Sequence, residues 1–216
     1  MPTELPFDLT PELAPLSWLI GAWEGQGRLG SGEDDTEIFY QRVDFTDHRL
    51  PFIEYRAETW LSEADGTLLR PLTVENGFWA LDRERRDGDV GPGMSPGDVV
   101  PVLRSADDVE AFRREDGSFP ITAQISHPGS LTELYYGVIK GPQLQLKTDS
   151  VLRGSAAGPY GGGSRIMGLV NGQLFWRWDA THHAGAGEEP HASAILDRMP
   201  DPTHGRLAPG TPRTSN

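Results

Sequence analysis

The sequence predicts an all-β protein that forms a single antiparallel β-barrel of about ten strands, with a short N-terminal helix. Apolar and charged residues alternate in FIEYRAETW, residues 52–60, as in a sheet with one face in water. The same alternation recurs in ITAQIS, QLQLK and QLFWRW. Turn residues separate about ten such runs, most clearly Asn171-Gly172, which is typical of a type I′ hairpin. No helical pattern lies between the runs, which argues against a parallel sheet.

The helix is expected in TPELAPLSWLIG, residues 10–21. Thr10 is a candidate N-cap, Pro11 occupies the first helical position and Gly21 is a stop signal. Apolar residues at 13, 16, 19 and 20 form one face. We expect a helix over residues 13–20 that closes one end of the barrel, either continuous or divided into two turns at Pro15.

The first strand is expected in GAWEGQG, where Gly21, Trp23, Gly25 and Gly27 alternate and project from one face. Such glycines indicate a strand that bends and lies close to a neighbouring backbone, with Trp23 packed at the end of the barrel. The segment opens no helix, which excludes a phosphate-binding loop.

The barrel is expected to occupy residues 13–199 as one domain, after an N-terminal extension over residues 1–12. Residues 82–108 are rich in Gly, Pro and Asp, and we expect a long irregular insertion there that lies over a barrel opening. Residues 200–216 have the composition of a disordered tail. At 216 residues with 37% apolar residues, the chain can bury one sizeable core.

The net charge and the absence of cysteine exclude several classes of partner and of active site. A net charge of −13 disfavours nucleic acid and membrane surfaces as partners. Without cysteine there is no disulfide, thiolate catalyst or cysteine metal site, so any metal needs histidine or oxygen ligands. No serine has the strand–turn–helix context that the nucleophile of a serine hydrolase needs. The N-terminal segment resembles no signal peptide, and no run is long enough for a membrane span, so a cytoplasmic protein is expected.

Histidines provide the candidate metal ligands. His191 lies in the last predicted strand, HASAIL, and shares one face with Ser193 and Ile195, which permits an inward imidazole. A second possibility is a zinc or non-haem iron site with the nearby groups His182, His183, Asp179 and Glu188, although a solvated loop explains those groups more simply. The remaining histidines, His48, His127 and His204, lie among turn residues and are assigned no role.

A set of segments in chain order resembles the nitrobindin family of haem-binding β-barrels, which are similar in shape to fatty-acid-binding proteins. The segments are PLSWLIGAWEGQG, PFIEYRAETW, ENGFW, HPGSLTELYYGVIKGPQLQLKTDSV, SRIMGLVNGQLFW and HASAIL. The resemblance extends over roughly residues 13–199. The Gly-x-Trp-x-Gly-x-Gly motif and the histidine of the terminal strand are its most specific features.

The resemblance implies that the protein binds ferric haem b with His191 as the axial iron ligand. It places Thr36 near a haem-contact threonine of the family. A lysine common in the family falls at AAGPYGGG, which has none, and Arg165 follows as its candidate replacement. Barrel aromatics are expected to line the porphyrin, namely Tyr55, Trp79 and Trp176.

The function that the resemblance implies is binding of nitric oxide and isomerisation of peroxynitrite to nitrate, which would make the protein a peroxynitrite isomerase. The alternative is a haem-free barrel that holds a fatty acid or another small apolar ligand. A basic pair inside the barrel would favour that alternative, but Arg56 and Arg177 fall on faces predicted to point outward. A third possibility is a family member that binds nothing tightly.

Overall fold

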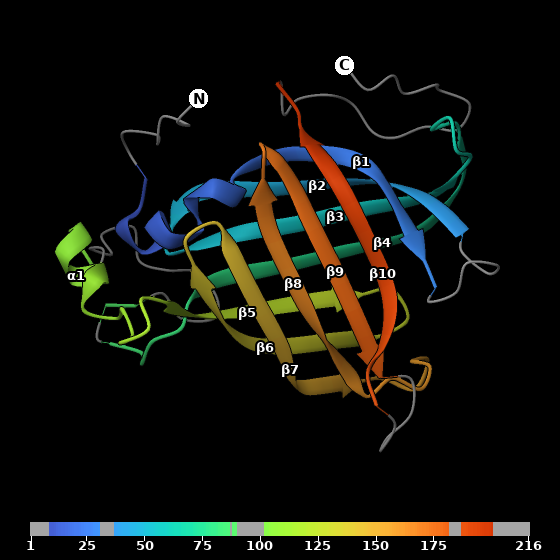
Figure 1. Ribbon diagram of the computed structural model, residues 1–216. Helices are drawn as coiled ribbons and strands as arrows, with labels where there is room; N and C mark the ends of the chain where they lie inside the picture. The colour runs from blue at the N-terminus through green and yellow to red at the C-terminus, as the bar shows by residue number, and fades with distance from the viewer. Residues whose placement is uncertain (1–8, 31–36, 87, 90–101, 182–186, 201–216) are drawn as a thin grey trace.

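The computed structural model describes residues 9–30, 37–86, 88–89, 102–181 and 187–200. These residues form a closed antiparallel barrel with the strand order β1-β10-β9-β8-β7-β6-β5-β4-β3-β2 (Figure 1). The strands are β1 (Gly21–Leu29), β2 (Glu37–Leu50), β3 (Phe52–Ser62), β4 (Leu68–Leu81), β5 (Phe119–His127), β6 (Leu131–Lys140), β7 (Gln143–Arg153), β8 (Gly162–Val170), β9 (Gln173–Thr181) and β10 (Glu189–Arg198). The predicted fold class is confirmed.

Alternation along the strands fills the barrel with apolar side chains. In β3, Ile53, Tyr55 and Ala57 are buried, whereas the residues between them are partly exposed. Every strand pairs with its sequence neighbour, and β1 also pairs with β10, so that the sheet has no free edge among the described strands.

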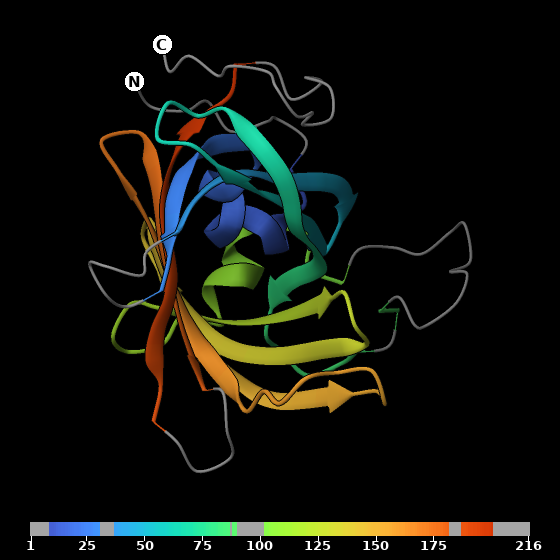
Figure 2. The same cartoon turned by 90° about the vertical axis from the view of Figure 1, so that its right-hand side faces the viewer.

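The N-terminal helix is a 3-10 helix, η1 (Pro11–Leu19), continuous through Pro15. A 3-10 helix has three residues per turn, so Leu13, Leu16 and Leu19 lie on one face, and all three are fully buried. Thr10 occupies the N-cap position, but its side chain makes no capping hydrogen bond. The helix closes one end of the barrel (Figure 2).

A short helix, α1 (Ala106–Glu110), lies beside η1 at this end of the barrel. The sequence predicts an irregular insertion over residues 82–108, but the last three of these residues belong to α1. The physical reason is local: Ser105 and Asp108 form a capping box, and Val109 is buried in the core. The other described residues of this segment contain no strand or helix.

The glycines of β1 allow close contact across the seam where the barrel closes. A Cβ on Gly25 would lie 2.2 Å from the Ile195 carbonyl oxygen of β10. A Cβ on Gly27 would lie 2.2 Å from the Phe39 ring and 2.4 Å from the Ser193 carbonyl oxygen. Trp23 is fully buried on the same strand, and its Nε1 donates a 2.8 Å hydrogen bond to the Leu19 carbonyl oxygen of η1.

Candidate functional site

The barrel encloses a cavity of about 260 Å³, here called the interior cavity. Its walls come from β1 to β4 and from β8 to β10. Most of the lining is apolar or aromatic, including Phe39, Tyr55, Met167, Leu174, Trp176 and Trp178. The polar lining includes Gln41, Glu75, Arg165 and His191. The cavity therefore combines flat apolar walls with one imidazole, a composition typical of a cofactor site.

A β-bulge in β10 determines where His191 points. Pro190 pairs with Asp179 of β9, and Ala192 pairs with the adjacent Trp178, so β10 advances two residues where β9 advances one. Such an insertion redirects a side chain. His191 consequently lines the cavity together with its neighbour Ala192, although a regular strand would turn them to opposite faces.

Because of the bulge, His191 does not lie on the same face of β10 as Ser193 and Ile195, contrary to the prediction from the sequence. Ala192, Ala194 and Leu196 are the buried residues of this strand, whereas Ser193 and Ile195 are exposed on the outside of the barrel. His191 does not share their face. Its backbone carbonyl oxygen accepts a 2.9 Å hydrogen bond from the Gly30 amide, which anchors the bulge to the end of β1.

Trp178 is the aromatic neighbour of His191. The two rings meet edge to face, with centroids 4.6 Å apart and planes at 77°. The guanidinium carbon of Arg165 lies 4.3 Å from the centre of the Trp178 ring, and the His127 ring stacks 6.0 Å away at 22°. The indole thus contacts the candidate ligand, His191, and two basic side chains.

Arg165 lies inside the barrel and is bound to Glu75. Its Nη1 and Nη2 donate hydrogen bonds of 2.9 and 3.0 Å to the two carboxylate oxygens of Glu75, and its Nε donates to the Tyr135 hydroxyl at 3.2 Å. Burial acts to raise the pKa of Glu75, but the charge of Arg165 and the hydrogen bond from His127 hold it well below its usual range. Arg165 is the one lysine or arginine among the described residues of the cavity wall, and Glu75 neutralises it.

His127 joins the same group of buried polar side chains. Its Nδ1 lies 3.3 Å from Glu75 Oε1, and its Nε2 lies 2.9 Å from Glu133 Oε2. Burial opposes protonation of His127, but the hydrogen bonds to Glu133 and Glu75 outweigh it and raise the pKa of His127 to about 9. Two carboxylates thus face two cations, Arg165 and His127. These four residues are called the polar network below.

The structure corrects the placement of His127 among turn residues. This histidine is the last residue of β5, and the buried residues Ile121, Ala123 and Ile125 precede it on the same face. Strict alternation along this strand points His127 inward. That pattern could have identified it from the sequence.

The other predicted site residues divide into three groups. Thr36, His182, His183 and His204 lie outside the described residues. Tyr55 and Trp176 line the interior cavity, whereas the fully buried Trp79 is not among the lining residues and packs against Phe45 and Tyr55. Arg56 pairs with Glu58 and is partly exposed, and Arg177 pairs with Asp179 and is exposed, in agreement with their predicted outward faces.

The zinc or non-haem iron alternative gains no support from the described residues. Asp179 bonds Arg177, and Glu188 bonds Lys147 and Ser164. Across the described part of the chain, no group of three histidine, aspartate or glutamate side chains is arranged to hold a metal ion.

His48 is exposed and lies 2.6 Å from Glu54.

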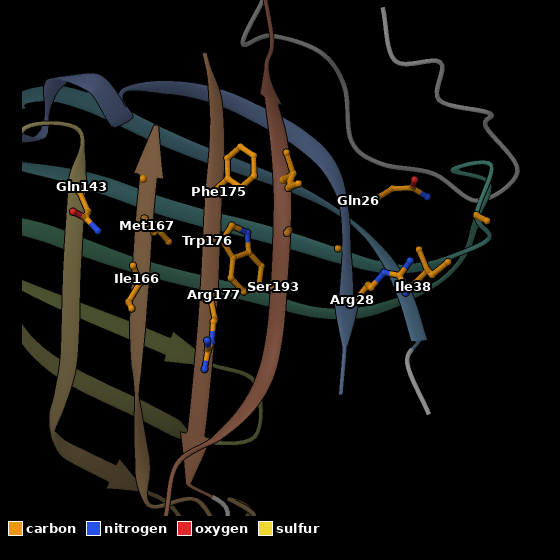
Figure 3. A pocket seen from close by; sticks show the side chains of 15 residues that line it. Gln26, Arg28, Ile38, Gln143, Ile166, Met167, Phe175, Trp176, Arg177 and Ser193 are labelled. Carbon is orange, nitrogen blue, oxygen red and sulfur yellow. The ribbon is translucent and has the colours of Figure 1, made fainter. Parts of the chain in front are cut away.

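A larger groove of about 740 Å³ lies on the outside of β8, β9, β10 and β1 (Figure 3). It is lined by outward residues such as the exposed Ile166 and Ile195, and it shares Met167 and Trp176 with the interior cavity. Its described lining contains no imidazole, carboxylate or phenol. The interior cavity is therefore the better candidate for metal or cofactor chemistry.

The residues of the interior cavity fit a haem group. Imidazole is a common axial ligand of haem iron, and aromatic and aliphatic walls suit a flat apolar macrocycle. Three lining atoms are buried without a hydrogen-bond partner among the described residues, namely Gln41 Oε1, Trp176 Nε1 and Trp178 Nε1. Buried polar atoms are rarely left in this state, which is consistent with a cavity that receives a ligand.

The search for membrane spans covered the described residues, and none of their helices is long and apolar enough to cross a membrane.

Comparisons with known proteins place the chain in a family. A family model described as "THAP4-like, heme-binding beta-barrel domain" matches residues 12–198. A protein of Micrococcus luteus named peroxynitrite isomerase is 74% identical over 213 residues, which cover 99% of this chain and 94% of that protein. A protein of Arthrobacter sp. (strain FB24) with the same name is 61% identical over 203 residues, covering 92% and 100%.

A solved structure shows the same fold. The crystal structure of Rv2717c from M. tuberculosis superposes with a TM-score of 0.61 at 21% identity and covers 88% of this chain and 99% of that one. The family indicated by the sequence motifs is confirmed, and the chain belongs to the THAP4-like, haem-binding β-barrel domains.

Proposed function

We propose that the protein binds ferric haem b in the interior cavity, with His191 as its axial ligand, and that the loaded protein binds nitric oxide and isomerises peroxynitrite to nitrate. The names of the Micrococcus and Arthrobacter relatives support the reaction. The observation that carries the proposal is the bulge between Pro190 and Ala192. It directs the imidazole of His191, a side chain able to bind iron, toward the aromatic interior cavity.

The chemistry agrees with the residues that line the cavity. Bound ferric haem supplies a Lewis acid to which a small anion such as peroxynitrite can bind. Isomerisation to nitrate breaks the O–O bond, forms an N–O bond and conserves all atoms and the charge, so it requires no proton from the protein. Glu75, the carboxylate of the described cavity wall, is held ionised by Arg165 and is therefore not a proton donor. The apolar walls limit the escape of reactive fragments.

Arg165 is proposed to contact the porphyrin as well. A guanidinium carries five N–H groups, of which Arg165 uses three for Glu75 and Tyr135. Two N–H groups remain for an acceptor at the edge of the macrocycle. The contact with Thr36 rests on the family resemblance.

The first experiment is a haem titration of the parent, His191→Ala and His48→Ala proteins. We expect a Soret band in the parent and at least about tenfold weaker binding by His191→Ala, because the porphyrin keeps its apolar burial but loses its coordinate bond. His48→Ala removes an exposed imidazole and should titrate like the parent. Equal affinity of the parent and His191→Ala proteins would exclude His191 as the ligand.

The second experiment measures peroxynitrite decay by stopped flow with haem-loaded protein, haem-free protein and free haem. We expect the loaded protein to accelerate decay and to yield nitrate with less tyrosine nitration than buffer. If loaded protein is no faster than haem-free protein, the isomerase proposal is wrong, and the barrel is better regarded as a binding module for an apolar ligand.

A further inference from the structure

We propose that Trp178 is a positioning residue that fixes the orientation of the His191 imidazole toward the haem iron. This inference rests on the proposed function and deepens it. Trp178 itself would bind neither iron nor substrate. Its role would be to hold the ring plane of His191, and the polar network would in turn hold Trp178.

The first support is the position of Trp178 at the bulge. Trp178 pairs with Ala192, the residue after His191, at the point where the register between β9 and β10 shifts. Its ring meets the imidazole edge to face at 4.6 Å and 77°. Aromatic rings prefer this arrangement, so the contact favours one orientation of the imidazole about its side-chain bonds.

The second support is that other side chains restrain the indole itself. Arg165 lies over its face at 4.3 Å, and Arg165 is in turn fixed by two hydrogen bonds to Glu75. His127 stacks on the ring, and Tyr160 meets it edge-on, each with centroids 6.0 Å away. A ring restrained by a buried ion pair can transmit its own fixed orientation to a neighbour.

The third support is the space left for the indole. Gly163 of β8 lies beside Trp178, and a Cβ at Gly163 would lie 2.9 Å from Trp178 Nε1. The absence of a side chain at Gly163 therefore allows the indole to occupy its observed position. The same Nε1 atom is buried without a partner among the described residues. Its position is thus set by ring contacts rather than by a hydrogen bond of its own.

Trp176 provides a matched control. It lies two residues earlier on the same strand and lines the same cavity, and its Nε1 is equally buried without a described partner. Its ring stacks on Phe39 at 5.9 Å, and no ring contact with His191 is found for it in the described structure. A change at Trp176 therefore alters the cavity wall, whereas a change at Trp178 also alters the support of His191.

The test is a double-mutant cycle on the rate of haem release to an excess of a haem scavenger. Trp178→Leu should speed release about three- to tenfold, as expected for the loss of one aromatic pair. In the His191→Ala background, Trp178→Leu should speed release by a clearly smaller factor, because only its contribution to the cavity wall is then lost. Trp176→Leu should change the rate by the same factor in both backgrounds. If Trp178→Leu also acts equally in both backgrounds, Trp178 is only a wall residue and the proposal is overturned.

A spectroscopic readout complements the cycle. The electron paramagnetic resonance spectrum of ferric haem should broaden in Trp178→Leu, because the imidazole adopts several orientations, and should stay narrow in Trp178→Phe, which keeps a ring. A Trp178→Phe spectrum as broad as that of Trp178→Leu would contradict the proposal. If Trp178→Leu does not fold, Trp178→Met replaces it, since methionine fills irregular space without a flat ring.

The cycle also separates this inference from the proposed function. If His191→Ala releases haem at the parental rate, the ligand assignment fails first. If His191→Ala accelerates release while Trp178→Leu acts independently of it, the haem function stands and only the positioning role of Trp178 is lost.

Discussion

Arg165 and Glu75, 90 positions apart in the chain, form a two-bond ion pair across the inside of the barrel. Their strands, β8 and β4, are separated in the sheet by β5, β6 and β7. The pair therefore spans the barrel interior rather than linking strand neighbours. Because both groups line the interior cavity, the pair shapes the candidate site as well as the fold.

Removing one member of this pair should be costly. Arg165→Met leaves the Glu75 carboxylate buried without its main partner, and we expect a loss of about 3–5 kcal/mol in the free energy of unfolding. The measurement is urea denaturation of the haem-free protein. Arg177→Met, which removes an exposed partner of Asp179, should cost less than about 1 kcal/mol. The double variant Glu75→Leu with Arg165→Met should recover most of the loss. If Arg165→Met costs no more free energy of unfolding than Arg177→Met, the account of a buried ion pair is contradicted.

His127 should make stability depend on pH above neutrality. Its pKa is about 9 in the folded protein and about 6.5 when unfolded, so folding favours the protonated form. This contribution is fully present below about pH 6.5 and is lost as pH rises toward and past about 9. At about 1.4 kcal/mol per pKa unit, it amounts to about 3 kcal/mol.

The check is the difference in unfolding free energy between the parent and His127→Gln, measured at about pH 6 and about pH 9.5. The difference should shrink at the higher pH. Glu75 and Glu133 stay ionised over this range, because the pKa of each is lowered. A difference that is constant with pH would show that His127 is not held protonated.

The seam between β1 and β10 should not tolerate a side chain at Gly27. A Cβ there would lie 2.2 Å from the Phe39 ring and 2.4 Å from the Ser193 carbonyl oxygen, so Gly27→Ala should destabilise the fold by about 1–3 kcal/mol. Because Phe39 lines the interior cavity, haem affinity should fall as well. Gly158→Ala is the control, since no atom lies within 4 Å of its Cβ position, and it should cost no more than about 0.5 kcal/mol. Equal unfolding midpoints for the two variants would argue against a tight seam.

Salt should speed the proposed reaction. The net charge of −13 repels the peroxynitrite anion at long range, and added salt screens that repulsion. We expect the second-order rate constant of the haem-loaded protein to rise by at least about twofold between low and physiological ionic strength. Free haem measured alongside corrects for salt effects on the chemistry itself. At acid pH, where more of the substrate is neutral, the salt effect should weaken, and a rate that falls with salt at neutral pH would contradict the prediction.

Local patterns in the sequence predict the barrel because its strands obey simple alternation. The run from Ile53 to Thr59 alternates in burial as expected, and the Asn171-Gly172 turn joins β8 to β9. The same rule would have found His127, had it been extended to the last residue of β5. For such elements, periodicity alone carries the information.

Two features of the site lie beyond local patterns. The orientation of His191 depends on a bulge, which is defined by how β10 pairs with β9 and not by the residues of β10 alone. The pairing of Arg165 with Glu75 joins residues 90 positions apart, and nothing near either residue indicates the other. The helix α1 is intermediate, because its capping box is visible as Ser105 and Asp108 within a stretch whose overall composition suggests a loop.

The closure of β10 onto β1 has a consequence for the order of events during folding. β10 pairs with β9, its neighbour along the chain, and also with β1 from Trp23↔Arg198 to Leu29↔Ala192, so the barrel closes only when its first and last strands meet. Contacts between residues so distant along the chain form slowly, because a long loop must close before they contribute. During synthesis, most of the cavity wall is translated before its imidazole. Haem captured before β10 has been made would therefore be held by the walls alone.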